Sequence, residues 1–320
     1  MAATRRAAYD VAMTIAAIPT LAQPQPRRVG TQTDLLGECP MWDERLQCLW
    51  WVDIRAPALR RWDPAHQALQ TWPMPELVGS IALTERDGVV LVALRSRLAL
   101  FDTTGDTASE RFETLVEARL PQDHRFNDGR CDRQGRFWVG TMHHLTRAPE
   151  GSLFRLDAQG LREVIAGGIA IPNSLAFSPD GRTMYFADSL QHRIDAFDYD
   201  PATGERGAVR ALAATLPPAF PDGSCVDGEG FLWSAQFHNA RLVRYAPDGR
   251  VERTLAVPMK RPTCCTFGGA DFGTLYVTGV SHSMSDAERA ADPLAGALFA
   301  FDIGREWGIH GLPEPRLHLN

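Results

Sequence analysis

Two carboxylates and two carboxamides stand in similar short segments of the chain, each within two residues of a glycine or a proline. These residues are Glu38, Asn127, Asn173 and Asp222. Their neighbours favour bends, so we predict that Asp222, between Pro221 and Gly223, lies on a tight bend and not within a regular element. Oxygen donors of this kind suit a hard divalent cation such as Ca²⁺, Mg²⁺ or Mn²⁺, and also Zn²⁺ or Fe²⁺ when water completes the shell.

A single Asn or Asp beside Gly or Pro is most simply a turn residue. The spacing of these four residues indicates more. With Ser80 and Thr263 they form the series 38, 80, 127, 173, 222 and 263, in which neighbours are 42, 47, 46, 49 and 41 residues apart. A regular series of this kind predicts that each residue occupies the same place in a repeated unit.

The repeated unit is visible in the apolar segments that follow. Six dense apolar runs have their second residues at positions 50, 91, 138, 185, 233 and 276, and most follow turn residues such as Asp87-Gly88. After each comes a segment of alternating polar and apolar residues, for example Leu98 to Asp102, which is typical of a half-exposed strand. Six units of 40 to 50 residues predict an all-β fold, a six-bladed β-propeller with four antiparallel strands per blade. A β-sandwich does not predict six equal units.

A closed ring would bring the four polar residues together. The innermost strands of a propeller line a central channel, and the loops that enter these strands meet at one mouth. Glu38 and Asp222 would then repel one another unless a cation or a shared proton neutralised them. We expect the segment 28–36 to pair with the last blade and close the ring.

Composition limits the class of protein. The net charge of −6 and a pI of about 5.9 argue against nucleic acid or an anionic membrane as the main partner, and no apolar run of about 18 residues predicts a membrane span. Six scattered Cys without a C-x-x-C pair favour unpaired, buried thiols, a reducing compartment and a cytoplasmic location; export is the alternative, because residues 5–22 vaguely resemble a signal peptide. We predict a leader or a misassigned start over residues 1–27 and one propeller domain over residues 28–320, as a monomer or weak homo-oligomer.

Five segments together resemble the senescence marker protein/gluconolactonase/luciferin-regenerating-enzyme family, which includes regucalcin and bacterial sugar lactonases. The segments are Gly37-Glu38-Cys39-Pro40-Met41-Trp42, Arg125-Phe126-Asn127-Asp128-Gly129, Pro172-Asn173-Ser174-Leu175, Pro221-Asp222-Gly223 and Pro262 to Gly269. The resemblance implies a six-bladed propeller with one divalent metal cation on the channel axis. It implies Glu38, Asn173 and Asp222 as metal ligands and Arg125 and Asn127 as contacts to a sugar lactone.

The chain departs from that family pattern at one place. His143 and His144 follow Gly140-Thr141-Met142, where regucalcin-like members carry a glutamate. We interpret His144 as a residue that could hydrogen-bond a substrate hydroxyl, with an ordinary loop histidine as the alternative. The departure leaves the preferred sugar open.

The resemblance and the residues together predict metal-dependent hydrolysis of a sugar lactone to the aldonic acid. In this hypothesis the cation binds water and the lactone carbonyl, and Asp222 acts as the general base. Two alternatives are a phosphotriesterase or arylesterase of the propeller type, and a non-catalytic calcium-binding propeller. The sequence contains no G-x-S-x-G, H-E-x-x-H, Walker A or Rossmann motif that would indicate a different chemistry.

Overall fold

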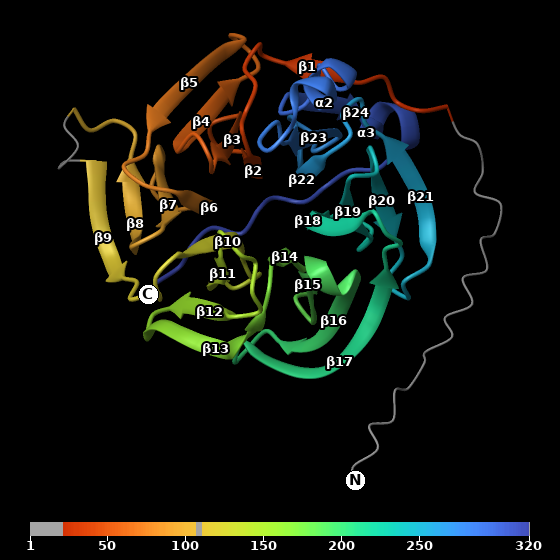
Figure 1. Ribbon diagram of the computed structural model, residues 1–320. Coiled ribbons are helices and arrows are strands. Elements are labelled where there is room, and N and C mark those ends of the chain that lie inside the picture. Colours follow the sequence, from red (N-terminus) through yellow and green to blue (C-terminus); the bar gives the residue numbers. More distant parts are fainter. Residues whose placement is uncertain (1–21, 107–110, 320) are drawn as a thin grey trace.

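Six four-stranded sheets are arranged in a ring around a central channel (Figure 1). The computed structural model describes residues 22–106 and 111–319. Neighbouring strands within each sheet are antiparallel. The predicted six-bladed propeller with four antiparallel strands per blade is therefore confirmed.

Each blade has an inner, a second, a third and an outer strand. The inner strands are β2 (Gly37–Asp43), β6 (Val78–Leu83), β10 (His124–Cys131), β14 (Pro172–Phe177), β18 (Phe220–Val226) and β22 (Pro262–Gly268). The second strands are β3 (Cys48–Asp53), β7 (Val89–Leu94), β11 (Phe137–His143), β15 (Thr183–Asp188), β19 (Leu232–Phe237) and β23 (Thr274–Gly279). The third strands are β4 (Ala58–Asp63), β8 (Arg97–Asp102), β12 (Gly151–Asp157), β16 (Arg193–Asp200), β20 (Arg241–Tyr245) and β24 (Leu298–Asp302). The outer strands are β5 (Ala68–Pro73), β9 (Phe112–Glu117), β13 (Gly160–Ile169), β17 (Glu205–Ala214), β21 (Val251–Ala256) and, for the sixth blade, β1 (Arg27–Val29).

Burial falls from the channel outward. The second strands of the first and second blades are buried at every residue, whereas the outer strand β17 is mostly exposed. Trp50, Trp138 and Trp233 of the second strands are completely buried. Adjacent blades cover both faces of each sheet, so the apolar runs that mark the repeat become the core between blades.

The N-terminal strand closes the ring. Strand β1 pairs with β24, with Arg27 opposite Ala300 and Val29 opposite Leu298, and an isolated bridge joins Leu36 to Val280. The predicted pairing of the segment before the first blade is confirmed, although its paired part begins at Arg27. The predicted leader lies mainly outside the described residues.

The polar residues predicted on bends lie within the inner strands instead. Asp222 belongs to β18, so the prediction that it is outside a regular element is wrong. All six inner strands contain an irregularity in which two residues oppose one on the second strand, as between Pro221 and Ser224. Glycine and proline mark these bulges for the same conformational reasons that they mark turns.

The six residues of the series do not all have the same place relative to the bulge of their strand. Glu38 and Asn173 are the last paired residues before the bulge, whereas Asn127, Asp222 and Thr263 lie in it. The six positions of the series are therefore neighbours in register and not strictly equivalent, which corrects the prediction.

The last residues cross the ring as an extended segment, residues 308–319, which we call the strap. Figure 1 shows it in dark blue, running from α3 (Ile303–Trp307) over the middle of the ring to the opposite blades. It contacts the turns between the inner and second strands: Gly228 N donates to His310 O, Leu317 N to Leu83 O, and His318 N to Gly135 O. These turns follow the inner strands, so the strap covers the end of the channel opposite the predicted site residues.

Short helices interrupt two loops, η1 (Ser189–Gln191) and α2 (Asp286–Ala291). Over residues 22–106 and 111–319 no helix is long and apolar enough to cross a membrane. All six cysteines are buried and unpaired with one another, as predicted.

Candidate metal and substrate site

A chain of hydrogen bonds joins three blades at the mouth of the channel. Arg125 Nη1 donates to Asn127 Oδ1 over 2.7 Å, and Asn127 Nδ2 donates to Asn173 Oδ1 over 2.9 Å. Asn173 Nδ2 then donates to Ser189 Oγ over 2.8 Å, and Ser189 Oγ donates to the carbonyl of Pro221 over 2.7 Å. The residues come from β10, β14, η1 and β18, so side chains far apart in sequence are fixed relative to one another.

The backbone is also specialised beside two of these residues. Cys39 and Ser174, which directly follow Glu38 and Asn173, have φ angles of 49° and 57°. Such values are uncommon for residues other than glycine and are maintained only when the surroundings enforce them. Ser174 Oγ supplies part of that enforcement, because it donates to Asp222 O over 2.5 Å and accepts from Ser224 Oγ over 2.9 Å.

Three buried carboxylates lie close enough to affect one another. Burial raises the pKa of Glu38 well above its ordinary value, and the charges of Asp222 and Asp128 raise it further. Burial and the charge of Asp128 raise the pKa of Asp222 in the same way. Burial raises the pKa of Asp128 to about 6, opposed by Arg130 and by the N–H of Leu175, which donates to the carboxylate over 2.8 Å.

The charge of these carboxylates is not balanced by neighbouring ion pairs. Among residues 22–106 and 111–319, no Lys, Arg or His side chain forms a salt bridge with Glu38, Asp128 or Asp222. Elsewhere in the fold buried carboxylates are paired, as Asp227 is with Arg244 over 2.8 Å. Arg125 and Arg130 lower the pKa values of these carboxyl groups only in part, since the net shift of each is upward. Buried charges of one sign are costly unless protons or a cation compensate them. The site therefore has the electrostatic character expected of a cation-binding centre.

The donor set also fits a hard cation. Glu38, Asn173 and Asp222 are at most 9% exposed, and all offer oxygen. Within the part of the chain that the structure describes, no three His, Cys, Asp or Glu side chains form a metal-binding group, so a centre here would need the amide of Asn173 as well as two carboxylates.

Arg125 and His144 are two of the predicted substrate contacts, and they come from β10 and from the loop after β11. Burial and, less strongly, the charge of Arg55 together lower the pKa of Arg125 to about 10, which still leaves the guanidinium charged at neutral pH. His144 is half-buried in the loop after β11, and its Nδ1 has no hydrogen-bond partner in the structure. Burial lowers the pKa of His144, as do the charges of Arg125, Arg55 and Arg95. A neutral imidazole with an unused nitrogen is able to bind a hydroxyl.

Sequence reasoning missed two residues at this site. It gave Asp128 no role, although its carboxylate accepts from the N–H of Leu175, two residues after Asn173. Ser189 was missed because it lies on η1, outside the repeated pattern, and no local motif marks a serine that bridges two blades.

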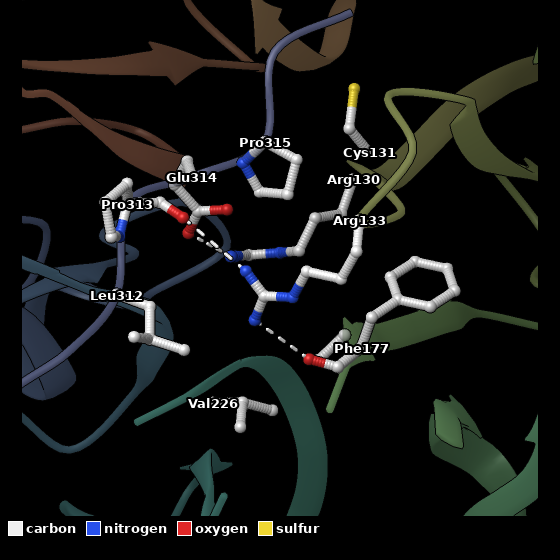
Figure 2. Close-up of a pocket in the computed structure, with 10 residues that line it drawn as sticks. Arg130, Cys131, Arg133, Phe177, Val226, Leu312, Pro313, Glu314 and Pro315 are labelled. Carbon is white, nitrogen blue, oxygen red and sulfur yellow. Dashed lines mark hydrogen bonds and ion pairs between the residues drawn. The ribbon is translucent and has the colours of Figure 1, made fainter. Parts of the chain in front are cut away.

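The small pocket in Figure 2 belongs to the other end of the channel. It is lined by Arg130 and Arg133 together with strap residues 312–315. Glu314 forms an ion pair with Arg130 there. This pocket contains none of the predicted site residues.

Comparison with known proteins places the chain in a family. Residues 36–281 match the model of the SMP-30/Gluconolactonase/LRE-like region, and the chain belongs to this family. It is 39% identical to a 6-deoxy-6-sulfogluconolactonase of Pseudomonas putida, over 89% of this chain and 95% of the relative. It is 42% identical to an L-arabinolactonase of Azospirillum brasilense, over 82% of this chain and 87% of the relative.

A solved structure supports the same relationship. The structure of a calcium-binding protein, regucalcin, from Agrobacterium tumefaciens superposes with a TM-score of 0.85 at 30% identity, covering 93% of this chain and 100% of that one. The family resemblance inferred from the five sequence segments is confirmed.

Proposed function

We propose that this protein hydrolyses a sugar lactone to the aldonic acid, with one divalent cation held by Glu38, Asn173 and Asp222. The observation that carries the proposal is the group of buried carboxylates without ion-pair partners, joined to a hydrogen-bonded amide network at the channel mouth. Two relatives at about 40% identity bear the names of lactonases, which supports this reaction class.

The chain supplies binding groups and a base for such a reaction. When bound, a divalent cation polarises a carbonyl and stabilises the negative charge that develops on its oxygen. Asp222 accepts a proton from the attacking water and returns it to the ring oxygen as the C–O bond breaks. Arg125 and Asn127, already fixed by their mutual hydrogen bond, orient the hydroxyls of the sugar. His144, neutral at pH 7, donates to or accepts from a further hydroxyl.

A chelation experiment tests this proposal. The protein is stripped of metal, reconstituted with Ca²⁺, Zn²⁺, Mn²⁺, Mg²⁺ or Fe²⁺ singly, and assayed with a pH indicator on a panel of aldonolactones. We expect chelation to lower the rate about 100-fold or more, and at least one ion to restore it, because a metal centre contributes several kcal/mol to such a transition state.

Three results would contradict the proposal. A lactone rate unaffected by chelation would exclude the cation from the reaction. Faster turnover of phosphotriesters or aryl esters than of any lactone would favour the other hydrolase class. Tight metal binding without hydrolysis of any ester would favour a calcium-binding propeller, the description borne by the Agrobacterium structure.

Ser189→Ala tests how the amide of Asn173 is positioned. The variant removes the acceptor of Asn173 Nδ2 and the donor to Pro221 O. We expect metal affinity to fall about 10- to 100-fold, as is typical when a residue that orients a ligand is lost. Affinity is measured by competition with a chromophoric chelator.

Ser152→Ala is the matched control. Ser152 is a buried serine of β12 whose Oγ accepts from Gly167 N, away from the site. Equal metal affinities for the two variants would show that Ser189 does not position the amide.

A further inference from the structure

Four arginines at the site end of the channel have no carboxylate partner. Arg55 lies in the β3–β4 turn, Arg95 in the β7–β8 turn, Arg125 in β10 and Arg147 in the loop between β11 and β12. None of them forms an ion pair within residues 22–106 and 111–319. Buried arginines elsewhere are paired: Arg130 with Glu314, Arg155 with Asp157, Arg244 with Asp227 and Arg316 with Asp43.

Hydrogen bonds hold two of these arginines toward the third blade. Arg55 Nη2 donates to the carbonyl of His144 over 3.3 Å, and Arg95 Nε donates to the carbonyl of His124 over 3.2 Å. These bonds use only part of each guanidinium, and the buried Nε atoms of Arg55 and Arg125 have no partner. Arg125 is only 4% exposed, so its unpaired donor is inside the site and not in bulk water.

The positive charges act on one another across the mouth. Burial lowers the pKa of Arg55, and the charge of Arg147 lowers it further. Arg55 and Arg147 both lower the pKa of Arg125 as well. The geometry agrees: Arg147 is exposed, its N–H donates to His143 O, and the carbonyl of the next residue, His144, accepts from Arg55, so the Arg147 loop lies beside the Arg55 turn.

The nearby acids have other partners. The carboxylate of Asp53 accepts the backbone N–H groups of Leu35, Leu36, Arg55 and Ala56 and so fixes the turn. Glu150, on the same loop as Arg147, lies 3.8 Å from His124 Nε2. Glu38 and Asp222 are the proposed cation ligands. Glu38 and Asp222 act on Arg125, but a bound divalent cation would neutralise these two carboxylates. The guanidinium groups of the mouth would then have no anionic partner, and a neutral sugar would leave them uncompensated.

We infer that the substrate is a lactone with a fixed negative charge on the part of the sugar remote from the lactone carbonyl. Arg55 and Arg147 bind this anionic group, a tetrahedral sulfonate or phosphate, by charge-assisted hydrogen bonds. Arg125 links this anion site to the centre, because its guanidinium donates to Asn127 and the charges of Arg55, Glu38 and Asp222 all act on it. The inference rests on the proposed lactonase function and names its substrate class.

Three matched substrates, one neutral and two charged, test the inference on the metal-reconstituted protein. D-Glucono-1,5-lactone is compared with the same ring bearing a 6-phosphate and with its 6-deoxy-6-sulfo analogue. We expect kcat/KM to be at least about tenfold higher for one of the charged lactones, and this advantage to shrink as NaCl screens the interaction. The two charged arms show which anionic group fits.

Variants locate the effect. We expect the double variant Arg55→Gln/Arg147→Gln to lower kcat/KM for the preferred charged lactone about 10- to 100-fold, mainly through KM. The factor by which kcat/KM falls for the neutral lactone should be at least tenfold smaller. Arg289→Gln is the control, because Arg289 of α2 lies in the loop between β23 and β24 at the same end of the channel but is paired with Asp286. Arg289→Gln should leave kcat/KM unchanged for both the charged and the neutral lactone.

The failures of the two proposals can be told apart. Hydrolysis of the neutral lactone with equal or higher kcat/KM than both charged ones would overturn the inference and leave the lactonase function standing. Equal losses on charged and neutral lactones in the double variant would also overturn it. Hydrolysis of none of these lactones, or of any other in the aldonolactone panel, would contradict the proposed function itself.

Discussion

Asp222→Asn should reduce lactone hydrolysis by about 10³-fold or more while the propeller remains folded. The substitution removes the proposed base and one charge of the proposed cation site but keeps the size of the side chain. Because burial and Asp128 disfavour the ionised form of Asp222, the metal-free variant should be as stable as the parent or more stable. Single-substrate kinetics and urea unfolding, each with and without metal, measure the two effects.

Asp248→Asn provides the control in the same blade. Asp248 is exposed in the turn between β20 and β21 and pairs with Arg250. Its variant should retain full activity. If Asp222→Asn kept more than a tenth of the parent rate, Asp222 could not be the base.

Glu314→Ala should cost about 3–5 kcal/mol of unfolding free energy, which is typical when one partner of a buried ion pair is removed. Burial alone would lower the pKa of Arg130, but the carboxylate of Glu314 raises it above the ordinary value. Without Glu314, a guanidinium that is 6% exposed is left at the channel end with no anionic partner. Urea unfolding measures the loss.

Two further variants make this result specific. Arg130→Met/Glu314→Leu removes both charges and should recover much of the stability lost in the single variant. Glu163→Ala, at an exposed position of β13, should change stability by less than about 0.5 kcal/mol. A cost below about 1 kcal/mol for Glu314→Ala would mean that the strap contributes little to holding the blades together.

The sequence predicts the ring well because every blade repeats the same physical problem. A second strand such as Leu232–Phe237 is buried on both faces and therefore carries a high density of apolar residues, so the six runs are visible without any structure. The bulges were not predictable, because Gly and Pro at Asp222 are equally compatible with a turn. For the same reason the sequence could not show that Glu38 precedes the bulge of its strand whereas Asp222 lies within the bulge.

Other features have no periodic signal at all. The capping box of α2, in which Ser285 and Glu288 bond reciprocally, was readable as S-x-x-E, but the helix is too short to show periodicity. The strap is a single segment that packs by individual contacts of Glu314 and Arg316. The arginines of the mouth come from three blades, Arg125 from a strand and the others from turns and loops, and only the ring brings Arg55 near Arg147.

The covered far end of the channel has a consequence for turnover. Arg316 donates to Thr84 O, after the inner strand of the second blade, and pairs with Asp43 of the first blade, so the last residues tie these two blades to the segment that follows α3. A molecule bound among the inner strands can then enter and leave only at the uncovered end of the channel. The acid product must therefore leave by the same opening through which the lactone enters. Accumulated acid and fresh lactone would exclude each other, so the reaction would slow as its own product builds up.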